Sequence, residues 1–245
     1  MQSDSGQPSI EIFDLTIMEP MVTFTDLWIT AVCIYAVVKL KKLNMKGKVH
    51  RNMRWYFAIM ALATFLGGIL GHAFQYAVGY EWKLPGWLIS MLSIMAIERA
   101  TIIHAQPVIN YRFGKILEVA NIVELITFAV ITFTTLNFFF IQVHSAYGLG
   151  LVVLPIHFLV YWRTRNEGSR IIFLSVIFAT LSAVFYTSEI GLHTWFNHLD
   201  LAHTVMAISM YLFYRGARKL EVLEYTDAKI KRGDFGDVVK DALRI

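Results

Sequence analysis

The sequence contains one cysteine in 245 residues, and charged residues make up only 16% of it. The cysteine, Cys33, lies inside an apolar run, which excludes an internal disulfide and a zinc site built from cysteines. The scarcity of charge excludes a soluble domain of this size, because 56% of the residues are hydrophobic and the mean hydropathy is +0.53. The composition therefore indicates a membrane protein with several spans.

Long apolar runs follow an acidic, polar segment at residues 1–20. Helices of membrane-spanning length are expected at residues 21–40, 55–80, 87–104, 116–135, 138–161, 171–192 and 199–214. Short connections between them predict one compact antiparallel bundle. The expected fold is an all-α membrane protein, with a seven-transmembrane-helix bundle at 21–217. A tail at 218–245 is expected to hold a short helix and a loosely ordered end.

Lysine and arginine are concentrated in every second connection, which predicts the orientation of the chain. The connection between the first two runs carries the basic residues Lys39, Lys41, Lys42, Lys46, Lys48, Arg51 and Arg54, whereas Lys83 is the only basic residue in a loop on the other side. Positive charge is retained on the cytoplasmic side, so the amino terminus is expected outside and the carboxyl terminus inside. The net charge of +4 thus reflects topology, and nucleic acid is not an expected partner. No removable signal peptide is expected, because residues 1–19 carry no positive charge. The predicted location is the plasma or inner cell membrane.

Ionisable residues inside the apolar runs gather near the predicted outer end. Such groups are costly in hydrocarbon, so they must face the bundle interior and find partners. Counted along the helix rise, a first set of similar depth comprises Asp26, His72, His144, Glu189, Asp200 and His203. A deeper set comprises Glu98, Arg99, Asn121, Glu124 and His157. For the deeper set, hydrogen bonds that fix helix packing are the favoured role, with transport as the alternative.

Neutral imidazoles together with a carboxylate are typical of a zinc site. The candidate zinc ligands are His72, His198 and His203, and Asp26 or Asp200 is expected to act as a catalytic general base or to orient a ligand. Gly67 and Gly71 allow a neighbouring backbone to approach closely, and the ring nitrogens of His72 and His203 are expected within ~4–5 Å of each other. The alternative is a hydrogen-bonded polar cluster without metal. Asp200 is also suited to capping the last helix, as is Asn197.

Two short segments resemble the CREST superfamily, which includes alkaline ceramidases and adiponectin-type (PAQR) receptors. Asp200-Leu-Ala-His203 is similar to the superfamily's Asp-hydrophobic-Trp-His motif, and Gly71-His72-Ala-Phe74 resembles its second-helix histidine. The resemblance implies a zinc-dependent membrane hydrolase of a lipid amide or ester. In that family the zinc would be held by His72 and groups of the seventh helix.

Two other functions stay open from the sequence. The first is a non-catalytic seven-helix receptor or sensor that binds a small ligand or a proton in the same polar cluster. The second is an ion or proton carrier that uses Asp26, His72, Glu98 and Glu124. A retinal protein is disfavoured, because no lysine lies within the seventh run to form a Schiff base. The partners expected are the lipid bilayer and either a lipid substrate or a small ligand.

Overall fold

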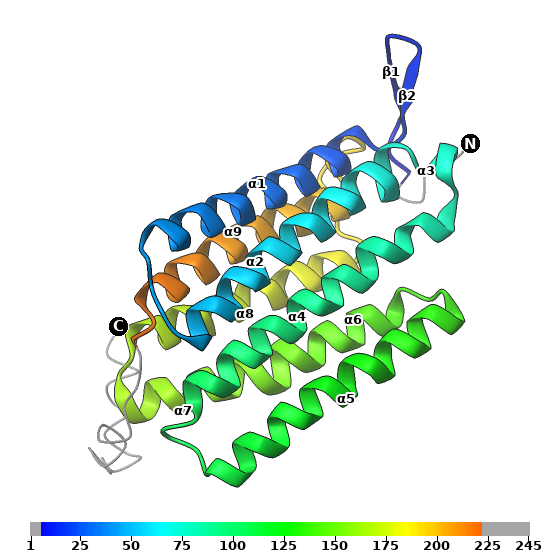
Figure 1. Ribbon diagram of the computed structural model, residues 1–245. Helices are drawn as coiled ribbons and strands as arrows, with labels where there is room; N and C mark the ends of the chain where they lie inside the picture. Colours follow the sequence, from blue (N-terminus) through cyan, green and yellow to red (C-terminus); the bar gives the residue numbers. More distant parts are fainter. Residues whose placement is uncertain (1–5, 222–245) are drawn as a thin grey trace.

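The helices of the computed structural model, which describes residues 6–221, lie side by side along one common direction (Figure 1). In chain order they are α1 (Pro20–Lys42), α2 (Lys48–Leu66), η1 (Gly67–Ala73), α3 (Gln75–Val78), η2 (Tyr80–Trp82), α4 (Lys83–Ala105), α5 (Tyr111–Thr135), α6 (Phe139–Ala146), η3 (Tyr147–Val153), α7 (Leu154–Thr164), α8 (Glu167–Thr187) and α9 (His198–Lys219). The segments η1 and η3 are π-helical and η2 is a 3₁₀ turn. The short helix expected in the tail lies outside the described residues. The end of α9 is the helical part of the tail that the structure describes.

Within residues 6–221, six helical segments are long and apolar enough to cross a membrane. They are Pro20–Lys42, Lys48–Ala73, Tyr80–Ala105, Tyr111–Thr135, Phe139–Thr164 and Glu167–Thr187. Each is at least as long as the stretch needed to span the hydrocarbon of a bilayer. The protein is therefore an integral, multi-pass membrane protein.

Several helices begin earlier than expected, and at two of them an asparagine caps the start. α5 begins at Tyr111 rather than at residue 116, because the Asn110 side chain accepts hydrogen bonds from the next free backbone N–H groups. α8 begins at Glu167 rather than at residue 171, because Asn166 does the same for Ser169. Both caps precede the apolar run, so the helix includes a polar first turn that hydropathy alone does not reveal.

The core lies where α1, α2, α4, α8 and α9 meet, and aromatic side chains fill it. Tyr56 and Phe57 of α2 and Phe213 of α9 are fully buried. The rings of Tyr56 and Phe213 meet edge to face with centroids 5.6 Å apart, and the Tyr56 hydroxyl donates to the sulfur of Met210. α9 packs against α8 and α1, and in Figure 1 it runs within the bundle.

A short β-hairpin precedes α1 and projects beyond one end of the bundle (Figure 1). Strand β1 (Ile10–Ile12) pairs antiparallel with β2 (Leu15–Ile17). The two turn residues, Phe13 and Asp14, both have positive φ, as a type I′ hairpin turn requires. The hairpin marks the end of the bundle at which α1 and α9 begin and η1 lies.

Candidate functional site

Four ionisable side chains from three helical segments meet at the hairpin end of the bundle. We call Glu19, Asp26, His72 and His203 the acid–histidine cluster. Glu19 is the residue before α1 and Asp26 lies seven residues further on, so both lie on one face of the helix start. His72 lies in η1 and His203 on the second turn of α9. The cluster therefore joins the first, second and last long segments of the described chain.

Glycines in η1 let α1 approach the cluster closely. A Cβ at Gly68 would lie 3.1 Å from the Asp26 Cβ, and one at Gly67 would lie 3.4 Å from Asp26 Oδ2. The backbone carbonyl of Gly68 also accepts a hydrogen bond from Thr23. Such close contact through small residues is how helices associate in lipid. The same glycines belong to the π-helical segment η1, and π-helical turns occur often at functional sites.

Glu19 fixes the orientation of the His72 ring. The His72 Nδ1 lies 2.5 Å from Glu19 Oε2, and the Glu19 side chain is almost fully buried. A carboxylate only accepts hydrogen bonds, so Nδ1 carries the hydrogen and donates it. The other ring nitrogen, Nε2, then faces Asp26 at 3.8 Å from Oδ2.

Thr25 and Asp26 orient His203 in the same manner. The Thr25 hydroxyl donates to the Val22 carbonyl, so at its 3.1 Å contact with His203 Nδ1 it must accept. His203 Nδ1 therefore carries a hydrogen, and Asp26 Oδ1 lies 3.7 Å from the same atom. His203 Nε2 is the ring nitrogen left free for a ligand. The carboxylate of Asp26 lies between the two imidazoles.

His72 and His203 lie close together, whereas the expected ~4–5 Å between their ring nitrogens stays a prediction. Their ring centroids lie 6.2 Å apart, and the rings meet edge to face. Glu19 and Asp26 are buried, whereas the two imidazoles keep 19% and 21% of their side-chain surface exposed. The site thus has buried acids behind two accessible histidines.

Asp200 and His198 occupy other positions. Asp200 is the third residue of α9 and forms a capping box with Asn197, so both candidates for the cap take part in it. Gln7 donates to the same Asp200 oxygen, and its carbonyl accepts from the backbone N–H of Met21. His198 begins α9 and its ring contacts Tyr186. Asp200 is therefore engaged in holding the start of α9 against α1.

The donor set is of the kind that zinc accepts, two imidazoles and a carboxylate. Among residues 6–221, however, no three His, Cys, Asp or Glu side chains form a group that could hold a metal ion as they stand. His72 Nε2 lies 3.8 Å from Asp26 Oδ2, slightly more than the ~3.4 Å that separates two donors of one tetrahedral zinc ion with bonds near 2.0–2.1 Å. The 3.7 Å contact between Asp26 and His203 is made by Nδ1, the ring nitrogen that carries the hydrogen. In this structure the cluster is held by hydrogen bonds and charge.

The expected division into two depth sets is wrong for His144. His144 was grouped with the outer residues, but its Nδ1 lies 2.5 Å from Glu124 of the deeper set. Its other ring nitrogen donates to the Met91 carbonyl. Glu98, fully buried, accepts a hydrogen bond from Asn121, whose carbonyl oxygen accepts from Arg99. As expected, Glu98 and its neighbour Arg99 do not pair with each other.

His157 and Glu189 are also placed differently from the expectation. His157 shares the Ser169 hydroxyl with His104, and its Nε2 contacts Thr101. This is a separate polar group between α4, α7 and α8. Glu189 is exposed in the connection after α8, where its φ is positive.

Sequence reasoning missed Glu19, Thr25 and Gln7. A signal existed for Glu19, because it precedes a proline at a helix start and lies two helical turns before Asp26. Gln7 had no signal, because its contacts with the starts of α1 and α9 depend on the path of the hairpin.

Comparison with known proteins gives a family but no activity. No curated protein and no solved structure matches the chain. The sequence profile of a family of unknown function (DUF6962) matches residues 21–222, from the start of α1 past the end of α9. Because this match covers most of the chain, the protein belongs to the family of unknown function DUF6962.

Proposed function

We propose that the protein is a zinc-dependent membrane hydrolase that cleaves an amide or ester of a lipid at the acid–histidine cluster. The observation that carries the proposal is the meeting of His72 and His203 at Asp26, with Glu19 behind His72. Histidines that bind metals usually donate their second ring nitrogen to a carboxylate or another acceptor. Both imidazoles have this arrangement, and each has Nε2 left to bind a ligand.

The residues of the proposed site have two roles: some would bind the zinc, and others hold these ligands in position. His72, His203 and Asp26 would hold the zinc, which supplies Lewis acidity and an activated water at neutral pH. Glu19 and Thr25 keep the two rings in the required tautomer. Asp200 and Asn197 fix the first turn of α9 and thereby the position of His203. We leave His198 out of the ligand set because its ring contacts Tyr186 in the last turn of α8.

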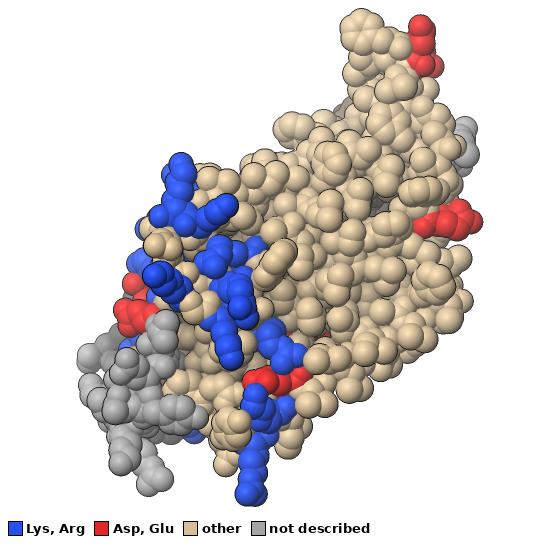
Figure 2. Space-filling view, viewed as in Figure 1, with Lys and Arg blue, Asp and Glu red and all other residues tan. Residues whose placement is uncertain are grey.

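A lipid is the proposed substrate because the site lies within the apolar bundle. The proposed topology has α9 as a seventh span, the hairpin outside and the end of α9 in the cytoplasm of a cell whose plasma or inner membrane holds the protein. The charge distribution supports it: Figure 2 shows Lys and Arg gathered at the end away from the hairpin. The resemblance to the CREST hydrolases points to the same substrate class.

Metal analysis of the purified full-length protein tests this function. Wild-type protein is expected to carry one zinc per chain, His72→Ala and His203→Ala to carry none, and His198→Ala to keep it. The same variants are then assayed on a ceramide and on a lipid ester. His72→Ala and His203→Ala should lose hydrolysis, and His198→Ala should keep it. Wild-type protein free of metal after zinc supplementation would end the proposal.

A receptor or sensor is the second candidate, and one observation favours it. In the described part of the chain no group stands ready to hold a metal ion, and the cluster is complete as a network of hydrogen bonds and charges. A ligand with hydrogen-bond donors and acceptors would then reach the exposed faces of His72 and His203. Ligand-dependent stabilisation without zinc or hydrolysis would favour this function.

A further inference from the structure

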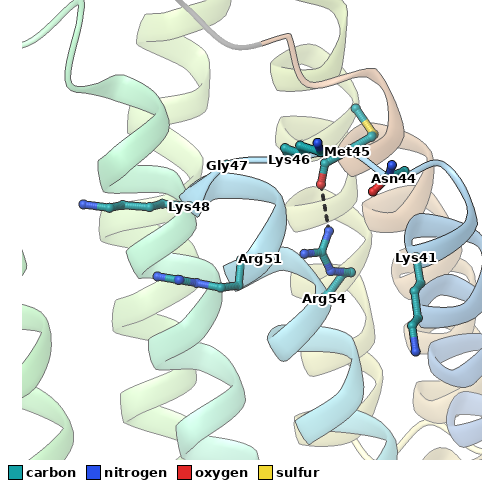
Figure 3. Close-up of a pocket in the computed structure, with 8 residues that line it drawn as sticks. All are labelled: Lys41, Asn44, Met45, Lys46, Gly47, Lys48, Arg51 and Arg54. Atoms are coloured by element: carbon teal, nitrogen blue, oxygen red, sulfur yellow. Dashed lines mark hydrogen bonds between the residues drawn. The ribbon is translucent and has the colours of Figure 1, made fainter.

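A basic pocket lies at the opposite end of the bundle, where the chain turns from α1 into α2. The cavity measures about 510 Å³, and the polar side chains that line it are Lys41, Asn44, Lys46, Lys48, Arg51 and Arg54. Figure 3 shows Lys48 and Arg51 extending side by side from the first turn of α2, while Arg54 turns back toward the loop. No acidic residue lines this cavity.

The positive charges of the pocket have no acidic partner. Among the described residues, no ion pair involves any of its five basic side chains, and Arg54 donates instead to the backbone carbonyl of Met45 (Figure 3). Two other cations at the same end are paired, Lys115 with Glu118 and Lys219 with Glu167. What distinguishes the pocket is that five basic side chains line one cavity that has no acidic residue in its lining.

The start of α2 adds to the positive potential. The helix begins after Gly47 without a side-chain cap and without an acidic residue in its first turn. A helix start carries partial positive charge and normally favours acidic residues, whereas this one carries Lys48 and Arg51. The arrangement is unfavourable by itself and becomes favourable when an anion is bound.

Aromatic side chains place the pocket at the level of lipid headgroups. Trp55 follows Arg54 directly and is 56% exposed on the outside of α2. Tyr35 of α1 is exposed as well, with the ammonium group of Lys39 5.4 Å from its ring centroid. Exposed tryptophan and tyrosine mark the interface between hydrocarbon and headgroups. An anion bound at this depth would lie beside the lipid headgroups.

We propose that this pocket binds the phosphomonoester headgroup of an anionic membrane lipid. A phosphomonoester carries about −1.5 to −2 charges and several acceptor oxygens, which matches five cationic side chains better than a singly charged phosphodiester. The proposal is independent of the acid–histidine cluster, which lies at the other end of the bundle.

Native mass spectrometry of the full-length protein tests the proposal, with phosphatidic acid as the phosphomonoester lipid and phosphatidylglycerol and phosphatidylcholine as comparisons. Wild-type protein should retain phosphatidic acid in preference to the other two. The double variant Lys48→Ala/Arg51→Ala should weaken the binding of phosphatidic acid roughly 30-fold, because each cation near an anionic lipid surface contributes a similar factor of about five to the affinity. Both side chains are exposed, and the thermal unfolding of the variant verifies that the fold is kept.

Arg112→Ala/Arg170→Ala is the matched control, since it removes two exposed cations from the same end but outside the pocket. Unchanged binding in this control supports a specific site. An equal loss in the control, or equal binding of phosphatidylcholine by the wild type, would overturn the proposal. Complete displacement of the lipid by inorganic phosphate would also overturn it, because the ligand would then be free phosphate.

Discussion

Glu19 shows how one residue outside the hydrocarbon runs can control a site within the bundle. Its carboxylate is almost fully buried and accepts the Nδ1 hydrogen of His72. Glu19→Gln keeps the size of the side chain but removes its charge and adds a donor. We expect the zinc affinity of the protein to fall by about 10- to 100-fold, as it does when an acidic partner of a ligating histidine is lost.

A competition titration with a zinc-binding dye measures this affinity. Glu11→Gln in the exposed hairpin is the control, because it makes the same chemical change away from the cluster. Equal affinity in wild type and Glu19→Gln would mean that the carboxylate does not support the metal site.

Glu124 tests whether the deeper polar residues serve packing. It pairs with His144, while its second carboxylate oxygen is buried without a partner. Because a hydrogen bond to His144 can persist through the amide oxygen, Glu124→Gln should lower stability by only ~0.6 kcal/mol and leave ligand binding intact. Thermal unfolding in detergent gives the first quantity and the assay of the site the second. Lost function at unchanged stability would instead favour the proton carrier.

The pairing of His144 with Glu124 also shows where sequence reasoning stops at this scale. Counting residues along each run gives a depth for every side chain, and this was enough to bring His72, His203 and Asp26 together. Counting failed for His144 because it gives the depth of a residue along its own helix only. Which residues of two helices meet also depends on how the helices are inclined to each other, and side-chain packing decides that inclination. The tautomers of the two site histidines likewise depended on Glu19 and Thr25, which hydropathy does not place.

At the scale of elements, η3 presents its glycines to two different surroundings. A Cβ at Gly148 would lie 2.2 Å from Glu98 Oε1 and 2.5 Å from Ile94 Cγ2, whereas one at Gly150 would meet nothing within 4 Å. Gly148→Ala should therefore force α4 and η3 apart and cost about 1–3 kcal/mol of stability. Gly150→Ala adds the same methyl group, but it should lower the stability much less. Thermal unfolding of the two variants compares them, and equal losses would contradict this account of the contact between η3 and α4.

The existence of the long helices was predictable from the sequence, but the form of two of them was not. Six of the seven predicted apolar runs correspond to segments of the described chain that are long and apolar enough to cross a membrane, and the caps that shift the starts of two of them are visible as Asn110 and Asn166. The π turns at η1 and η3 leave no hydropathy signal, because they change the hydrogen-bond pattern and not the composition. The glycines in both segments were the available signs.

At the scale of the whole molecule, the topology predicts which ends accept a label. Gln7 is buried, so Glu11 in the hairpin is the better external reporter, with Lys46 as the internal one. The single cysteine, Cys33, is fully buried and will not react with a membrane-impermeant maleimide. On intact cells, Glu11→Cys should be labelled and Lys46→Cys should not, and permeabilisation should reverse the second result. Labelling of both on intact cells would rule out α1 as a membrane crossing between an outer hairpin and a cytoplasmic Lys46.

The shallow contact of α5 with the rest of the bundle has a consequence for how the family can vary. Only 11% of the most apolar stretch of α5 is buried inside the bundle. The buried residues of the helix, Gly114, Asn121 and Thr132, follow one stripe along it. Selection on close packing can act on that stripe, while the apolar positions elsewhere on the helix need only to be soluble in lipid. Related sequences should therefore exchange one apolar residue for another freely along α5, with the substitution rate falling sharply at these three positions.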